Sequence, residues 1–102
     1  MKRYRFLVEA DTELQEHIRY FDEQVAGLGD KFIADLEAVI RGLREYPESG
    51  APVSRNLRKR ALRVFRHNVY YVNAPGEIII VAVAPHLRRP GYWRSRLKDL
   101  RP

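Results

Sequence analysis

One apolar run near the end of the chain constrains the fold more than any other feature of the sequence. The seven residues from Ile78 to Ala84 are all isoleucine, valine or alanine, and Pro85 follows directly. A strand with one exposed face would alternate apolar and polar residues, so an unbroken run indicates a strand buried on both faces. We therefore expect a central strand, which delivers the residues after it to one edge of a sheet.

The residues delivered there are basic and aromatic, since Pro85 to Trp93 read PHLRRPGYW. The charge of the whole chain points the same way. Residues 1–50 carry seven Lys/Arg against eleven Asp/Glu, a net charge of −4, whereas residues 51–102 carry twelve against two, a net charge of +10. Such a split favours a partner that is nucleic acid or an acidic protein, and arginine suits phosphate and carboxylate groups especially well.

Length and composition exclude several classes of protein. The chain of 102 residues suffices for one domain, spanning residues 1–102, and the lack of cysteine excludes disulfides and thiolate metal sites. His17, His67 and His86 show no ligand spacing and there is no glycine-rich phosphate loop, so we expect neither a metal nor a cofactor. The sequence shows no signal-peptide core and no membrane-spanning run, and we expect a cytoplasmic protein without membrane contact.

The N-terminal half predicts one strand and two helices. Residues 4–8 read as a short strand, and a first helix is expected from a cap at Asp11 or Thr12. A glycine break at residues 27–29 separates it from a second helix, which Pro47 ends. Because apolar residues recur at helical spacing in both segments, the two helices should pack as an antiparallel hairpin.

The C-terminal half predicts three strands and a docked tail. The strands are expected at residues 57–65, 68–73 and 78–84, with turns at 66–67 and 74–77. The tail after Gly91 should form a short helix or a docked extension anchored by Trp93 and Leu97. The order β-α-α-β-β-β predicts an α+β domain, in which an antiparallel sheet carries the N-terminal helical hairpin on one face.

This order should bring charged residues together at the sheet ends, because a turn at residues 74–77 places Ala84 opposite His67. The residues expected at that end are Arg66, His67, His86, Arg88 and Arg89. A second basic group is expected at the opposite end, roughly 20 Å away at about 3.4 Å per residue. It consists of Arg55, Arg58, Lys59 and Arg60.

The same stretches resemble the RelE/ParE superfamily of bacterial toxins, and more narrowly its ParE-like, plasmid-stabilisation branch. The resemblance spans about residues 3–97 and rests on the order of the elements and on several short segments. These are Phe32 to Glu37, Tyr46 to Pro52, Leu57 to Phe65, Val69 to Tyr71, and Ala82-Val83-Ala84 followed by Arg88 to Trp93. The chain departs from the family pattern at Pro85, which stands where many ParE-like sequences have a histidine, so that His86 comes one position later.

The resemblance implies the toxin of a type II toxin–antitoxin system, held in a hetero-oligomer with a ParD-like antitoxin whose helix and extended tail wrap it. ParE members act on DNA gyrase, and RelE-like members cut mRNA inside the ribosome. For the antitoxin we expect a groove along the outside of the helical hairpin, next to arginines that pair with an acidic tail. The residues expected there are Tyr20, Val25, Val39, Leu43, Arg58 and Arg60.

The residues alone leave three functions open. An RNase needs proton carriers and cations on the phosphate, and its candidates are His67, His86, Tyr92, Arg63 and Arg88. No obvious carboxylate base accompanies them, because the second half holds only Glu77 and Asp99. A gyrase inhibitor needs only a complementary surface, for which the candidates are Arg66, Arg88, Arg89 and Tyr92, and direct contact with nucleic acid stays open. We favour this non-enzymatic inhibitor; the third alternative is a non-toxic module that only holds an antitoxin.

Overall fold

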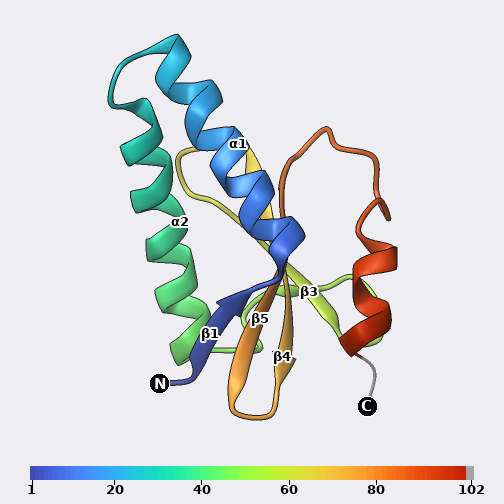
Figure 1. Ribbon diagram of the computed structural model, residues 1–102. Helices are drawn as coiled ribbons and strands as arrows, with labels where there is room; N and C mark the ends of the chain where they lie inside the picture. Colours follow the sequence, from blue (N-terminus) through green and yellow to red (C-terminus); the bar gives the residue numbers. More distant parts are fainter. Residues whose placement is uncertain (101–102) are drawn as a thin grey trace.

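A helical hairpin and the C-terminal tail cover opposite faces of one five-stranded sheet. The computed structural model describes residues 1–100. Figure 1 shows the two helices on one side of the strands and the tail, drawn in red, on the other. The elements are β1 (Arg3–Phe6), α1 (Val8–Gln24), α2 (Leu28–Glu45), β2 (Ala51–Pro52), β3 (Leu57–Ala61), β4 (His67–Ala74), β5 (Glu77–Pro85) and a 3-10 helix (Arg94–Leu100). The predicted α+β class and the docked tail are confirmed.

The sheet is mixed, and the expectation of a fully antiparallel sheet is wrong for β1. The strand order is β1-β5-β4-β3-β2, with β1 parallel to β5 and every other pair antiparallel. The helical hairpin returns the chain to the end of the sheet at which β1 began (Figure 1). The strands β3 and β5 therefore run in the same direction as β1. The short strand β2 was not among the predicted strands.

The strand β5 is buried on both faces, as its apolar run predicted. Ile78 to Ala84 are all buried. On the helix side, Ile78 and Ile80 join a cluster with Phe32 from α2. On the tail side, Ile79 joins a second cluster that includes Trp93. Two cores thus meet at one strand, which explains why polar residues are absent from Ile78 to Ala84.

A β-bulge in β5 changes the register that the sequence predicted. Tyr71 pairs with Ile80, but Tyr70 pairs with Ala82, so that Val81 is the extra residue. Consecutive residues Val81 and Ala82 accordingly both pack in the tail-side cluster. His67 therefore lies opposite Pro85 instead of the expected Ala84.

Both helices begin earlier than predicted. The helix α1 begins at Val8, and Thr12, expected as a cap, lies inside it with its hydroxyl donating to the Val8 carbonyl at 3.0 Å. Burial of Ala10 in the core explains the extra turn. The helix α2 begins after Gly27, whose φ of 86° favours glycine. In its first turn the Gly29 N–H donates to the Asp22 carboxylate at 2.8 Å.

Two other boundaries differ from the prediction. The strand β3 ends at Ala61 instead of residue 65, and residues 62–66 form the connection to β4. His67, expected in that turn, is the first residue of β4 and is buried. Within residues 1–100, no helix is long and apolar enough to cross a membrane.

Candidate functional site

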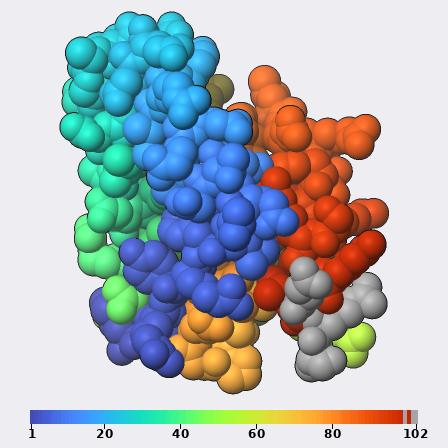
Figure 2. All heavy atoms as spheres, in the orientation of Figure 1, coloured from blue at the N-terminus to red at the C-terminus, as the bar shows by residue number. Residues whose placement is uncertain are grey.

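The two loops at one end of the sheet meet through histidine contacts. The His86 N–H donates to the Arg66 carbonyl at 3.0 Å, and His86 Nε2 lies 3.1 Å from the His67 carbonyl oxygen. The predicted convergence of Arg66, His67 and His86 is therefore confirmed. The arginines of these loops are exposed: Arg63, Arg66, Arg88 and Arg89. Figure 2 shows the loop after β5, in orange, standing out beside the helices. We call these four arginines the arginine rim.

A buried carboxylate shapes the loop between β3 and β4. Asp35 on α2 is 7% exposed, and its oxygens accept from the backbone N–H groups of Arg63, Val64 and Phe65 at 2.8–3.0 Å. A loop of this kind has no strand partner for its N–H groups, so a side chain must satisfy them. Asp35 thus fixes the backbone that carries Arg63, whose side chain points into solvent.

His67 is a core residue and is withdrawn from any bound substrate. Its side chain is 8% exposed, and its ring lies 4.9 Å from the rings of His17 and Phe32. The pKa of His67 is lowered to about 4, mainly by burial and also by the nearby His17 and His86, against an opposing effect of Asp35. The imidazole is therefore neutral near pH 7 and has no path to a proton on a bound RNA.

Tyr92 is held by Glu13, a carboxylate from the other end of the sequence. The Tyr92 hydroxyl donates to Glu13 Oε2 at 2.6 Å, and the tyrosine ring lies under two guanidinium groups, those of Arg88 at 4.4 Å and Arg96 at 5.0 Å. Burial raises the pKa of Tyr92 above its ordinary value, and the hydrogen bond to Glu13 raises it further. The hydroxyl therefore keeps its proton.

Arg96 completes this cluster. It donates to both carboxylate oxygens of Glu13, at 2.8 and 3.1 Å, and to the Val81 carbonyl at 3.0 Å. The side chains of Arg96 and Glu13 are only 13% and 18% exposed. This ion pair ties the tail to α1 at a place where water screens it weakly.

These side chains also cap an open sheet edge. The strand β1 pairs with β5 only from Glu77 to Ile80, and within residues 1–100 no strand pairs with the rest of β5 on that side. The Val81 carbonyl accepts from Arg96 at 3.0 Å, and the Val83 N–H donates to Glu13 at 3.1 Å. The Val83 carbonyl lies 3.0 Å from His17 Nε2. Side chains thus replace the missing strand partners.

The expectation that no carboxylate lies near this end of the sheet is wrong. The second half of the chain supplies no carboxylate there, but Glu13 reaches this edge from α1. The one local signal was the spacing of Glu13 and His17, four residues apart and therefore on one helix face. Nothing in the sequence indicated that this face turns toward β5.

The second predicted basic group is spread along β3 instead of gathered at one end. Arg58 lies opposite Tyr71 in mid-strand and donates to the Gly50 carbonyl at 2.9 Å. Arg60 lies opposite Val69 and donates to the Ser49 hydroxyl at 3.1 Å. Arg55 lies toward the β4–β5 turn, in an open groove that also includes Arg58 and Pro75. The prediction failed because β3 is five residues long and centred on β4.

Of the four residues of the helical hairpin expected in the external groove, two are exposed. Tyr20 and Val25 are 57% and 60% exposed. Val39 and Leu43 are 1% and 0% exposed, so their assignment to an external groove is wrong; they belong to the stripe of α2 that packs on the sheet.

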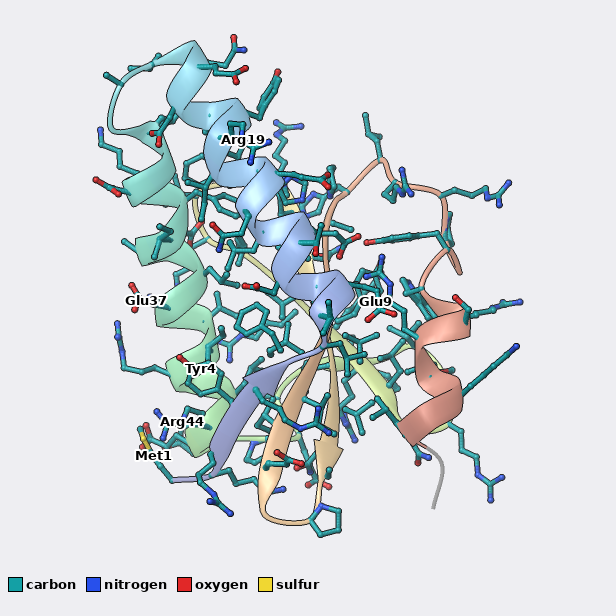
Figure 3. The ribbon with its side chains drawn as sticks, viewed as in Figure 1. Met1, Tyr4, Glu9, Arg19, Glu37 and Arg44 are labelled. Carbon is teal, nitrogen blue, oxygen red and sulfur yellow. The ribbon has the colours of Figure 1, made fainter. Side chains whose placement is uncertain are left out.

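Near the N-terminus, Tyr4 lies beside Arg44, with the guanidinium 5.3 Å from the ring centre (Figure 3).

Comparison with known proteins decides the family. The family model described as "ParE toxin of type II toxin-antitoxin system, parDE" matches residues 4–90. The chain belongs to this ParE toxin family. A comparison with curated protein sequences finds no match. Among solved structures, the chain is similar to one described as "Chromosomal ParDE TA system from P. aeruginosa", with a TM-score of 0.72 and 15% identity over 83% of this chain and 96% of that one. At that identity the likeness shows the shared fold.

Family membership confirms the resemblance that the sequence segments carried. The family match ends at Pro90, before the tail that contains Tyr92 and Arg96. The cluster of Glu13, Tyr92 and Arg96 therefore joins a helix inside the matched ParE region to a segment outside it.

Proposed function

We propose that this ParE-family toxin arrests growth in the cytoplasm by binding DNA gyrase, and that a ParD-like antitoxin neutralises it in a hetero-oligomer. The proposal concerns the target and the partner, since the family itself is that of toxins from type II toxin–antitoxin pairs. It treats the protein as an inhibitor that acts by binding.

The observation that carries the proposal is the state of the proton-transferring side chains. His67 is buried, with a pKa of about 4, and the Tyr92 hydroxyl is donated to Glu13. Glu13 itself accepts four hydrogen bonds, which leaves it poorly placed to take a proton from a substrate. General acid–base cleavage of RNA needs such groups within reach of the 2′-hydroxyl and the leaving oxygen. The arginine rim, in contrast, is exposed and suits an acidic or phosphate-bearing surface.

The antitoxin surface is proposed on the outer side of the helical hairpin. Tyr20 and Val25 are large exposed apolar groups, one on α1 and one directly after it. Arg58 and Arg60 each use one guanidinium nitrogen within the chain and retain further donors for an acidic tail.

Growth arrest by variants at matched expression tests the target. Replacing Arg88 and Arg89 by alanine should weaken arrest strongly, because each lost charged contact costs about 1.5–3 kcal/mol. His86 is the one exposed histidine of the site and so its most accessible proton carrier. Because an inhibitor that acts by binding needs no proton transfer, His86→Gln should leave arrest nearly intact. Tyr92→Phe is a poor probe of proton transfer, because the hydroxyl also holds Glu13.

The matched control removes two exposed helix arginines, Arg19 and Arg41 (Arg19 is labelled in Figure 3), and lowers the net charge equally. It should arrest growth like the parent. Mapping of mRNA ends accompanies the assay. Loss of arrest in His86→Gln, together with codon-phased mRNA cuts in the parent, would contradict the proposal and favour the RNase. A parent that causes no arrest would favour the non-toxic module.

A further inference from the structure

Arg88 is the one member of the arginine rim whose side chain is packed against an aromatic ring. Its guanidinium lies 4.4 Å from the centre of the Tyr92 ring. An arginine that stacks on a ring is restricted in orientation, whereas a solvated arginine samples many rotamers. The direction in which Arg88 points is therefore coupled to the position of Tyr92.

The loop that carries Arg88 has little else to hold it. Pro85 to Pro90 are all exposed, and Leu87 is 98% exposed. The Arg88 N–H donates to the Pro85 carbonyl at 3.0 Å, a bond within the loop itself. Figure 2 shows this segment projecting from the body of the molecule. The loop is thus anchored where it begins, at His86, and where it ends, at Tyr92.

The anchor at Tyr92 depends on Glu13. This carboxylate accepts from the Tyr92 hydroxyl, from the Val83 N–H and twice from Arg96. It therefore fixes the ring against both the central strand and the tail. The Glu13 carboxylate contacts Arg88 only through the ring, with Tyr92 between them. The chain of contacts runs from α1 through Glu13 and Tyr92 to Arg88.

We infer that Glu13 is a positioning residue, which orients Arg88 for contact with the target by fixing the Tyr92 ring. The inference rests on the proposed function, because it assigns Arg88 to the target-binding surface. Glu13 itself touches no target. Its effect on inhibition passes through the two side chains that follow it in the chain of contacts.

A double-mutant cycle separates positioning from a general loss of stability. Glu13→Gln keeps the shape of the side chain and removes its charge, and Arg88→Ala removes the group that is positioned. We expect Glu13→Gln to weaken inhibition roughly threefold to tenfold, the size of a partly exposed cation–π contact. In the Arg88→Ala background the same change should cost less than about twofold, because the group that it orients is gone.

The matched control is Glu16→Gln, an equal loss of charge at an exposed position of the same helix. It should leave inhibition unchanged in both backgrounds. Because Glu13→Gln also removes an ion pair, Tyr92→Phe serves as a second variant: it breaks the link to Glu13 and leaves the Glu13–Arg96 pair in place. It should show the same loss and the same dependence on Arg88.

A structural readout keeps this inference distinct from the choice of target. The ring current of Tyr92 should shift the side-chain NMR signals of Arg88 in the parent, and the shift should collapse in Glu13→Gln and in Tyr92→Phe. If the parent arrests growth without inhibiting gyrase, the proposed target is wrong. The double-mutant cycle is then measured by growth arrest instead of gyrase inhibition. A retained ring-current shift in both variants, or equal losses with and without Arg88, would overturn the positioning role.

Discussion

Replacement of Trp93 tests whether the tail is part of the folded core. Trp93 is 4% exposed and packs in the tail-side cluster with Leu57, Val72 and Ile79, and its ring lies 5.4 Å from that of Tyr70. The tail is the cover of this face of the sheet (Figure 1). Removing the indole should therefore uncover apolar surface on the central strand and release the tail.

The expected cost of Trp93→Ala is large for a domain of this size. Truncation of a buried tryptophan or phenylalanine to alanine costs about 3–5 kcal/mol, against a total stability of roughly 5–15 kcal/mol. At about 4–8 °C per kcal/mol, the melting temperature should fall by at least ~12 °C. Trp93→Phe should cost below about 1.5 kcal/mol, because it keeps a ring in place and removes an indole N–H that has no partner within residues 1–100.

Urea unfolding followed by far-UV circular dichroism is the assay, since Trp93 is the sole tryptophan and its fluorescence is lost in the variants. The two variants are compared at equal concentration, with the slope of the transition checked for a change in exposed surface. A cost of Trp93→Ala below about 1 kcal/mol would refute the reasoning, and would show instead that the ring is free for contact with the target.

Three further predictions concern groups whose environments the structure defines. Burial lowers the pKa of His67 from 6.5 to about 4, so between these values the unfolded state binds a proton that the native state does not. The free energy of unfolding should therefore fall by about 3 kcal/mol between pH 7 and pH 4, and His67→Phe should remove this share of the pH dependence of the urea midpoint. A Cβ at Gly50 would lie 2.6 Å from a buried tyrosine hydroxyl and 2.8 Å from a backbone oxygen, whereas one at Gly42 would meet only the movable end of an arginine. In thermal melts, Gly50→Ala should cost about 1–3 kcal/mol and Gly42→Ala should not destabilise; equal effects would contradict the packing. Asp35→Ala should cost at least about 2 kcal/mol in urea because three backbone N–H groups lose their acceptor, and Glu37→Ala, an exposed change on the same helix, should be near neutral.

Much of the fold could be predicted because its signals are local. The unbroken run from Ile78 to Ala84 required a strand covered on both faces, and the two helical stripes supplied one of the covers. The element order could not give the parallel placement of β1, since that depends on how the hairpin returns the chain. The bulge at Val81 was equally hidden, because a run of uniformly apolar residues carries no alternation from which to detect an extra residue.

The site was predictable only in part, for a physical reason. Arg66, His67 and His86 converge as predicted because strand pairing fixes their positions. The partner of Tyr92 was missed because Glu13 lies seventy-nine residues away in sequence, and contacts at that separation leave no trace in spacing. The same limit misplaced Val39 and Leu43: helical periodicity shows that residues share a face, and packing decides which face is inside.

The measurement that tests the central claim most directly is a DNA supercoiling assay with purified gyrase and this toxin after removal of its antitoxin. The account predicts concentration-dependent inhibition by the parent and by His86→Gln, weakened inhibition when Arg88 and Arg89 are both alanine, and restored supercoiling when the antitoxin is added back. Undiminished supercoiling at saturating toxin, in a preparation that arrests growth and cuts mRNA on ribosomes, would contradict it.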